Sequence, residues 1–397
     1  MHSGGKPPCC GGLGWTAGAG GGPGGQSVYR NRPSGFHPAL ARGEGTNDFM
    51  KAAVFYDIGD IRVEEVPEPS LGPGEVLLKV GAAGICGTDL RIFTAGHHRI
   101  PPGTRRILGH EFAGEIAAVG EGVSGLSPGM RVAVAPNIGC GVCPECVAGW
   151  TNLCEDYRAF GISLDGALAE YLRIPADAIR QGNVVPLPAS VPFDVAALAE
   201  PLSCCLNGQE AVGVGPGDGV LIIGAGPIGM MHLLLARLAG ARYVMVSEIH
   251  PVRLAQARAH GADWVVNPQE QDLRAAVMEI SEGRGADVVI VAAPTAEGQQ
   301  QAIELAARRG RVNFFGGLPK DRPFATLNTN LIHYRQLVVT GTTGSNVRQF
   351  RTTVHLLAAG RIHLDSLITS RLGLGEIHEG FARARSAQEM RVVILPG

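Results

Sequence analysis

Four cysteines in one short stretch have the spacing of a metal site. They are Cys140, Cys143, Cys146 and Cys154, in the run CGVCPECVAGWTNLC. Two Cys-x-x-Cys steps and a fourth cysteine one loop later can close four thiolates around one tetrahedral Zn²⁺. A closed site of this kind leaves no position for substrate, so it stabilises a loop and does no catalysis. Disulfides or free thiols are the alternatives, and zinc is favoured because the chain otherwise has the character of an intracellular protein.

A glycine motif predicts a dinucleotide site. GAGPIG follows the apolar run GVLII and contains Gly224, Gly226, Pro227, Ile228 and Gly229 as candidate cofactor residues. Between a strand and a helix, this motif allows a tight turn, close approach of the backbone to a pyrophosphate and close helix–strand packing. The phosphates would meet free N–H groups at the positive end of the helix. A glycine turn without a ligand is the alternative.

The choice of nucleotide depends on Glu248, which ends the next apolar run, 24 residues after Gly224. A carboxylate there can bind both ribose hydroxyls of NAD and would repel the 2′-phosphate of NADP. Arg253 lies five residues further on, where it could stack beside adenine or neutralise a phosphate. The sequence favours NAD over NADP.

Three further segments carry side chains suited to a second metal site. They contain Cys86, Thr88 and Asp89 in GICGTDL, His110 and Glu111 in GHEFAGE, and Glu200 in AEPLSCC. Each segment alone has an ordinary explanation, namely a small buried cysteine, a solvated loop pair and a helix-capping carboxylate. Their joint presence beside a four-cysteine loop and a dinucleotide motif favours a catalytic metal site.

The elements that must position these residues change character along the chain. Residues 50–202 read as short strands separated by Gly and Pro turns, which predicts a β-rich domain with long loops. Residues 203–342 alternate apolar runs with helical stretches, which predicts an α/β fold with a parallel doubly wound sheet. Residues 343–397 return to mixed structure. Residues 1–49 are crowded with glycine and predict a disordered extension, with Met50 as the hypothetical natural start.

Composition limits the partners. A chain of 397 residues suits two domains, and a net charge of −2 without charge blocks gives no sign of a nucleic-acid or membrane partner. No apolar run reaches membrane-spanning length. Five of the nine cysteines lie where metal ligands are expected, which indicates a reducing compartment and hence the cytoplasm.

The motifs CGTD, GHE, the four-cysteine loop, EPL and GAGPIG follow one another from Met50 to the C-terminal half. In this order they make the chain resemble the zinc-dependent medium-chain dehydrogenases of the alcohol and polyol dehydrogenase family. The resemblance implies a GroES-like catalytic domain, residues 50–202 completed by 343–397, and a Rossmann NAD-binding domain, residues 203–342. It also implies two zinc ions per chain, a small alcohol or ketone substrate, and a homo-oligomer, either a tetramer or a dimer.

The same resemblance assigns the metal ligands. Cys86, His110 and Glu111 would hold the catalytic zinc, and Glu200 would hold it or exchange with its bound water. One cysteine, one histidine and one carboxylate leave an open fourth position, as catalytic zinc requires. Because zinc can lower the pKa of bound water from 15.7 to about 7, an alcohol there would become acidic enough to release a hydride to NAD⁺.

The resemblance also implies a proton path, with one departure. Asp89 would fix the ring of His110, and Thr88 would pass the released proton outward. Many polyol and threonine dehydrogenases carry a histidine five residues after the first cysteine, whereas this chain has Arg91, which does not exchange protons near neutral pH. His97 and His98 could replace that histidine, but a solvated loop is the preferred interpretation. Arg91 could instead contact a phosphate or a substrate oxygen.

Further cofactor contacts follow from the resemblance. They are Phe315, Gly316 and Gly317 after one strand, and Thr342 and Thr343 after the next. The predicted activity is NAD-dependent oxidation of a secondary alcohol on a polyol, sugar or similar substrate. L-Threonine 3-dehydrogenase is the alternative of the same class, and a redox-inactive, zinc-stapled nucleotide-binding protein is the alternative of another class.

Overall fold

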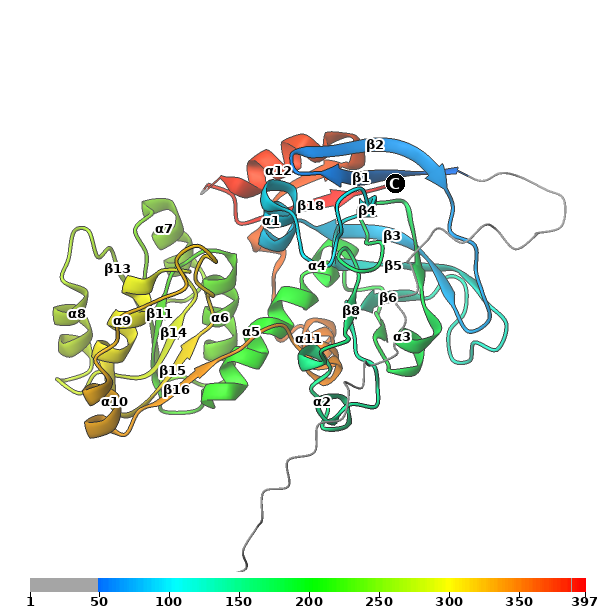
Figure 1. Cartoon of the computed structure of the whole chain (residues 1–397). Coiled ribbons are helices and arrows are strands. Elements are labelled where there is room, and N and C mark those ends of the chain that lie inside the picture. Colours follow the sequence, from blue (N-terminus) through cyan, green and yellow to red (C-terminus); the bar gives the residue numbers. More distant parts are fainter. Residues whose placement is uncertain (1–48, 387) are drawn as a thin grey trace, which may run out of the picture. The chain divides into compact units, whose positions relative to one another are not determined.

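The computed structural model describes residues 49–386 and 388–397, in which the strands form four sheets (Figure 1). The predicted glycine-rich extension lies outside the described residues, apart from Phe49 at the start of the first strand. Within the described part of the chain, no helix combines the length and the apolar character needed to cross a membrane.

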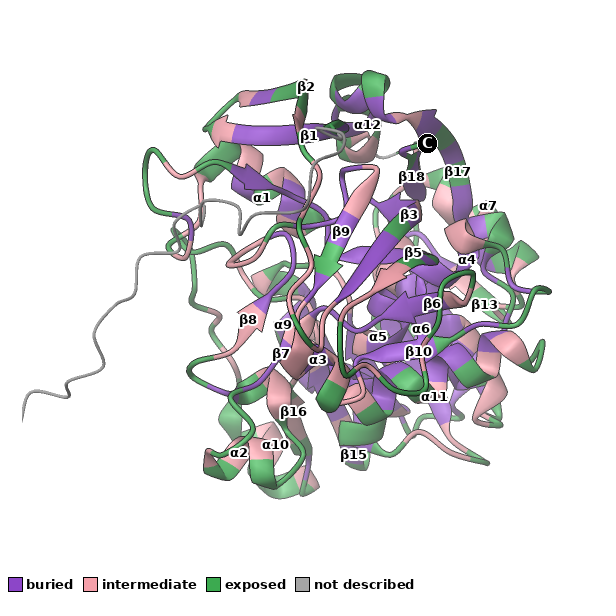
Figure 2. Ribbon diagram, turned by 90° about the vertical axis from the view of Figure 1, so that its right-hand side faces the viewer, coloured by how far each residue is buried: buried purple, intermediate pink, exposed green. Residues whose placement is uncertain are grey.

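The sheets of the N-terminal half are built from short strands, as their spacing predicted. Their bounds are β1 Phe49–Asp57, β2 Asp60–Pro67, β3 Val76–Gly84, β4 Arg106–Ile107, β5 Glu111–Val119, β6 Arg131–Val134, β7 Asn137–Ile138, β8 Arg158–Ala159, β9 Tyr171–Ile174 and β10 Val184–Pro186. One sheet has the order β2-β1-β4, and β7 pairs with β8. A seven-stranded sheet has the order β10-β6-β5-β3-β18-β17, with β9 also paired to β3. Figure 2 shows β3 and β5 buried along most of their length.

The end of the chain returns to this seven-stranded sheet. Its last two strands are β17 Ile368–Gly373 and β18 Arg391–Leu395. β18 pairs antiparallel with β3, with Val393 opposite Gly84 and Ile394 opposite Ala83. Residues more than 300 positions apart in the sequence therefore share one sheet.

A second, six-stranded sheet is parallel throughout. Its strands are β11 Gly219–Ile223, β12 Tyr243–Ser247, β13 Trp264–Val266, β14 Ala286–Val291, β15 Ala306–Phe314 and β16 Val338–Gly341. The order β13-β12-β11-β14-β15-β16 is that of a dinucleotide-binding doubly wound fold. Every residue of β11 and β12 is buried, which explains why these segments read as unbroken apolar runs and not as alternating ones.

The helices connect and cover the sheets. They are α1 Gly87–Ala95, α2 Pro144–Val147, α3 Ala176–Arg180, α4 Phe193–Ala197, α5 Ala199–Val212, α6 Pro227–Leu238, α7 Pro251–Ala259, α8 Leu273–Ile280, α9 Ala296–Leu305, α10 Thr329–Arg335, α11 Val347–Ala358 and α12 Ile377–Arg385. Three short 3₁₀ helices are η1 Thr151–Leu153, η2 Asp365–Leu367 and η3 Leu374–Glu376. Helix α5 runs unbroken through residues 202 and 203, between which the sequence analysis places a domain boundary. That boundary remains a prediction.

Helix α5 is tied to α11 by polar contacts between buried side chains. Asn207 Nδ2 donates to the carbonyl oxygen of Gly344 at 2.9 Å, and Gln349 Nε2 donates to Asn207 Oδ1 at 3.0 Å. Thr353 Oγ1 donates to the carbonyl oxygen of Ala199 at 3.1 Å. These bonds fix the helix that carries Glu200 against the segment that follows β16.

Candidate active site

Strand pairing brings the first two candidate ligands together. β3 ends at Gly84, which lies opposite Glu111, the first residue of β5. Cys86 follows β3 and His110 precedes β5, so the pairing places them side by side. One ligand atom each from Cys86, His110 and Glu111 lies within 4.8 Å of the other two. Both His110 and Glu111 are buried.

Asp89 links the two segments that carry these ligands. Its side chain is fully buried near the start of α1. Oδ2 accepts from the backbone N–H of Cys86 at 2.8 Å, and Oδ1 accepts from the N–H of Gly109 at 3.1 Å. The distance from Oδ1 to Nδ1 of His110 is 3.6 Å, longer than a hydrogen bond. Asp89 therefore fixes the backbone on both sides of the cluster and acts on the His110 ring through its charge.

The electrostatics of the cluster favour a thiolate beside an imidazolium. Burial alone would raise the pKa of Cys86, but His110 lowers it and the net direction is down. Burial alone would lower the pKa of His110, but Asp89 and Cys86 raise it, and the net result is well above its usual value. A metal ion would replace that proton, because it binds the thiolate and the neutral imidazole.

A further observation fits a metal ion in this cluster. Among the described residues, Oε1 of Glu111 is buried without a hydrogen-bond partner. The other Glu111 oxygen contacts Nη2 of Arg391, a buried residue at the start of β18. Unpartnered buried polar atoms are costly, so an absent partner is expected here.

Glu200 lies near this cluster but outside the three-donor set. It is buried on α5, and Oε1 accepts from the thiol of Cys204 at 3.3 Å. Burial raises the pKa of Glu200, against the opposing effect of His110. Burial also raises the pKa of Cys204 well above its usual range, which keeps it a protonated donor. Glu200 and Cys204 lie four positions apart on α5, so their side chains are neighbours on one face of the helix.

Thr88 and Arg91 are joined directly. Nη2 of Arg91 donates to Oγ1 of Thr88 at 2.9 Å, as the three-residue spacing on α1 allows. Arg91 is exposed. The position expected to carry a relay histidine therefore holds a permanent cation that orients the hydroxyl of Thr88.

The four cysteines of the loop also converge. One sulfur from each of Cys140, Cys143, Cys146 and Cys154 lies within 4.8 Å of the others, and all four are free thiols. Backbone N–H groups point at the sulfurs, as in Cys143 N to Cys140 Sγ at 3.3 Å. Hydrogen bonds from the N–H groups of Val142 and Cys143 lower the pKa of Cys140 to about 7. Four sulfurs with this spacing fit a tetrahedral zinc ion.

The glycine motif lies at the carboxyl end of β11, where the strand order reverses between β11 and β14. Gly224 has φ 102°, which other residues rarely adopt. A Cβ on Gly229 would overlap the carbonyl oxygen of Gly224, so the close approach of α6 to the turn requires glycine. Gly226 caps α6, with Pro227 and Ile228 in its first turn.

Glu248 follows β12 and holds the glycine turn in place. Its Oε2 accepts from the N–H of Ala225 at 2.9 Å, and Oε1 accepts from Ile249 N at 2.7 Å and His250 N at 3.1 Å. Nη1 of Arg253 lies 4.0 Å from Oε2 of Glu248. Glu248 and Arg253, the two residues predicted to distinguish NAD from NADP, therefore lie beside the glycine motif.

The remaining predicted cofactor residues follow the ends of β15 and β16. The ring of Phe315 packs edge-on against His232 of α6, with ring centroids 4.7 Å apart. Gly316 and Gly317 come next, and a Cβ on Gly316 would lie 2.9 Å from the carbonyl oxygen of Ala293. Oγ1 of Thr342 accepts from Asn313 Nδ2 at 3.5 Å.

The four-cysteine loop contacts this cofactor segment. Asn152, in η1 of the loop, donates from Nδ2 to the carbonyl oxygen of Thr343 at 2.8 Å. This contact spans 191 positions in the sequence, so no local pattern could have predicted it. A loop predicted to serve only its own stability also holds a segment predicted to bind the cofactor.

Comparison with known proteins decides the family. The family model of the alcohol dehydrogenase GroES-like domain matches residues 72–189, and the family model named zinc-binding dehydrogenase matches residues 227–359. L-Threonine 3-dehydrogenase of Pyrococcus abyssi is 38% identical over 338 residues, covering 83% of this chain and 94% of that protein. Sorbitol dehydrogenase of Bacillus subtilis is 33% identical over 355 residues, covering 87% and 97%.

The chain belongs to the zinc-dependent medium-chain alcohol dehydrogenase family.

A solved relative agrees with this membership. A structure from Sinorhizobium meliloti, described as a zinc-binding dehydrogenase bound to NADP, matches this dehydrogenase with a TM-score of 0.81 at 35% identity. The match covers 88% of this chain and 100% of the other. The family resemblance and the fold class, a GroES-like region with a Rossmann-type parallel sheet, are thereby confirmed. This dehydrogenase is an oxidoreductase that acts on a small molecule.

Proposed function

We propose that this dehydrogenase oxidises a secondary alcohol on a polyol, a sugar or a similar hydroxylated molecule, with NAD as the hydride acceptor. One observation carries the proposal: a thiol, an imidazole and a carboxylate converge within 4.8 Å. A four-coordinate zinc held by three such donors keeps one position for substrate. The four converging cysteines would hold a second, structural zinc, which gives two ions per chain.

The reaction needs an acidic hydroxyl and a hydride acceptor. A zinc ion at Cys86, His110 and Glu111 would supply the first by Lewis acidity, and the nicotinamide would supply the second. The carbon loses a hydride and its oxygen loses a proton, so R₂CHOH and NAD⁺ give R₂C=O, NADH and H⁺. The protein must therefore bind the alcohol, hold its carbon still and remove one proton.

The removal of the proton falls to Thr88. Its hydroxyl oxygen has two lone pairs, and Arg91 donates to one of them at 2.9 Å. The second lone pair can accept the substrate proton while the hydroxyl hydrogen of Thr88 passes to water, which the half-buried side chain can reach. Because a guanidinium does not exchange protons near neutral pH, Arg91 orients the hydroxyl and does not carry the proton itself.

Asp89 and Glu200 position the groups around the substrate. Asp89 accepts from the backbone on both sides of the cluster, which limits how far Cys86 and His110 can separate. Glu200 is held by the Cys204 thiol, and burial raises its pKa. A carboxylate with a raised pKa can bind a proton closer to neutral pH than an exposed one can.

NAD is proposed over NADP because of Glu248. Its carboxylate follows β12, beside the glycine turn, where it would meet the adenosine ribose. A 2′-phosphate would be repelled there, although Arg253 lies close enough to offset part of the repulsion. The NADP in the Sinorhizobium meliloti relative makes this a question to measure: the ratio of kcat/KM for NAD to that for NADP should exceed one.

L-Threonine 3-dehydrogenase is the second candidate. Several relatives with that name are 37–38% identical to this chain. Threonine carries a secondary hydroxyl, so the same three-donor set would serve. Arg91 in place of a histidine counts slightly against this assignment. A homo-oligomer and a cytoplasmic location, both expected from the sequence, remain predictions.

The test is a substrate screen on metal-replete protein. NADH formation is followed with a panel of polyols, sugars and L-threonine, with zinc content measured on the same sample. Oxidation of a polyol, lost on chelation and restored by zinc, supports the proposal. Activity on L-threonine alone selects the second candidate. No turnover with any alcohol, at two zinc ions per chain, would favour a redox-inactive nucleotide-binding protein.

A further inference from the structure

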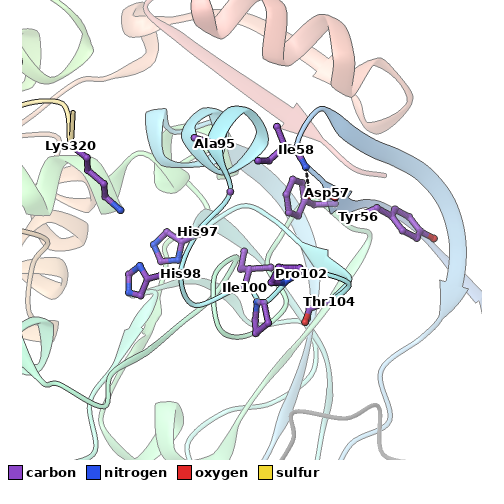
Figure 3. Close-up of a pocket in the computed structure, with 13 residues that line it drawn as sticks. Tyr56, Asp57, Ile58, Ala95, His97, His98, Ile100, Pro102, Thr104 and Lys320 are labelled. Atoms are coloured by element: carbon purple, nitrogen blue, oxygen red, sulfur yellow. Dashed lines mark hydrogen bonds between the residues drawn. The ribbon is translucent and has the colours of Figure 1, made fainter. Parts of the chain in front are cut away.

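The loop that follows α1 forms a surface pocket of about 330 Å³. Figure 3 shows the rings of His97 and His98 beside each other, with the side chain of Lys320 extending toward them from a distant segment. The two rings are stacked, with centroids 4.4 Å apart and planes at 29°. The pocket is therefore lined on this side by nitrogen-bearing side chains from two parts of the chain.

Two arginines add to the positive charge beside the pocket. Arg91 on α1 and Arg99 after the histidines both act electrostatically on His97, as do His98 and Lys320. We call Arg91, His97, His98, Arg99 and Lys320 the cationic cluster; its positive charge comes from the two arginines and the lysine, since the His97 ring is neutral near pH 7. Burial first, and then the charges of the other four members, lower the pKa of His97 to about 4.

In the part of the chain that the structure describes, no carboxylate forms an ion pair with the arginines or the lysine of the cationic cluster. Arg99 donates to the carbonyl oxygens of Tyr157 at 2.8 Å and Glu155 at 2.9 Å, which fixes its position without removing its charge. Within the described residues, neither Arg91 nor Lys320 forms an ion pair within 4.0 Å.

Among the described residues that line the pocket, Asp57 is the one carboxylate, and it accepts a hydrogen bond in a turn. Oδ1 of Asp57 accepts from the N–H of Ile58 at 2.8 Å, between β1 and β2. Positive charges that outnumber the one carboxylate raise the free energy of the empty pocket, and an anion would lower it.

Helix α1 connects the cationic cluster to the candidate metal ligands. Cys86 caps the start of α1, and Arg91 lies five residues along the same helix, or roughly 8 Å at 1.5 Å per residue. Arg91 also donates to Thr88. α1 ends at Ala95, and His97 follows after Gly96. A substrate with its hydroxyl at the three-donor set and a charged group a few bonds away would place that charge next to Arg91.

We propose that the substrate of this dehydrogenase carries an anionic group, a phosphate monoester or a carboxylate, that binds in the cationic cluster. This inference rests on the proposed function, since it names the class of alcohol oxidised. A phosphate monoester should bind more tightly than a carboxylate because it carries nearly two negative charges at neutral pH. The cluster would then act as the specificity site for the end of the substrate remote from the reacting carbon.

The first experiment compares a neutral hexitol, its 1-phosphate and the matching hexonate, at low ionic strength and with NAD. The phosphorylated substrate is expected to have a kcat/KM at least about tenfold above that of the hexitol, with the hexonate between them. In Lys320→Met and in His98→Asn this selectivity should fall by about tenfold, through KM. Arg322→Met is the matched control, because Arg322 is 81% exposed and lies outside the pocket lining.

The outcomes of the first experiment separate the two proposals. Equal kcat/KM for the charged and neutral alcohols, or a preference that survives both variants, would overturn the anion site while leaving the proposed function intact. A preference for the hexonate over the phosphate would keep the anionic substrate and select the carboxylate. Absence of turnover on all three would count against the proposed function, and the second experiment then decides the anion site.

The second experiment needs no turnover. The ring protons of His97 are followed by NMR across pH, with and without inorganic phosphate, and assigned with His97→Gln. A bound anion favours the protonated ring, so the pKa of His97 should rise from about 4 when phosphate is present. The rise should be smaller in Lys320→Met than in Arg322→Met. A pKa that does not respond to phosphate would contradict the proposal.

Discussion

At the scale of single residues, the three-donor set depends on charge as much as on spacing. Cys86 and His110 are separated by 24 positions, but each shifts the pKa of the other toward its charged form. Asp89 holds both segments and has no contact with solvent. A buried cluster of this kind is stable only if its charges are satisfied together, which is what a metal ion would do.

The role of Cys86 can be tested by substitution. Cys86→Ser replaces a thiolate ligand by a hydroxyl that binds zinc poorly, so turnover should fall by at least about a thousandfold and zinc content by one ion per chain. The Kd for NADH, measured by fluorescence titration, should stay within about twofold. Loss of both turnover and NADH binding would instead point to a role of Cys86 in folding.

The hydroxyl of Thr88 can be tested with a matched pair. Thr88→Val keeps the shape and removes the hydroxyl, so kcat should fall by about 100-fold or more, as expected for the loss of a proton-transfer group. Thr88→Ser retains the oxygen that accepts from Arg91 and should keep most of the activity. A similar kcat in the two variants would remove Thr88 from the proton path.

At the scale of elements, α6 carries a histidine that must stay neutral. His232 is fully buried, and desolvation lowers its pKa to about 3. Gln209 Nε2 of α5 donates to its backbone carbonyl at 2.6 Å, and its ring packs on Phe315. α5, α6 and the end of β15 therefore meet around an imidazole that cannot take up a proton without leaving its surroundings.

This gives a prediction for stability against pH. His232 has a pKa of about 6.5 in the unfolded chain. Below that pH the unfolded chain binds a proton that the folded chain does not bind, so the free energy of unfolding falls as the pH falls toward 3. Between pH 6 and 4.5 the loss from His232 alone is roughly 2 kcal/mol. His232→Leu should lack this part of the slope in urea titrations at constant zinc concentration.

The same measurement on His355→Leu serves as the control, because the His355 ring is exposed on α11. Loss of zinc in acid affects all three proteins alike and cancels in the comparison. An unchanged slope in His232→Leu would show that the histidine is not held neutral by the fold.

At the scale of the whole molecule, the last strand of the chain pairs with a strand of the N-terminal half. β18 joins the sheet of β3, and Arg391 at its start contacts Glu111 of the three-donor set. Asn152 of the four-cysteine loop holds Thr343 after β16. Residues far apart in the sequence thus supply the contacts that hold each predicted site.

A truncation tests which part of the chain this arrangement needs. All the candidate site residues lie at or after Cys86, and the first described sheet pairs residues from 49 onward. A variant beginning at Met50 should therefore have kcat/KM and a melting temperature within experimental error of the full chain. A clear drop in kcat/KM would show that residues 1–49 contribute to the site.

The sequence by itself determined what depends on local spacing. The four-cysteine loop, the glycine turn after an apolar strand, and the alternation of strands and helices follow from patterns within about 30 residues. These patterns were sufficient for the family and the fold class, both of which are confirmed. The domain boundaries and the roles of the site residues remain predictions.

Only the tertiary structure decided the contacts between distant segments. Strand pairing sets Glu111 opposite Gly84, and helix packing brings Gln349 of α11 to Asn207 of α5. Lys320 meets His97 and His98 by the folding of a separate segment. Such contacts depend on how whole elements pack. Burial and charge act through space, and a linear pattern does not record which distant side chains will lie close together.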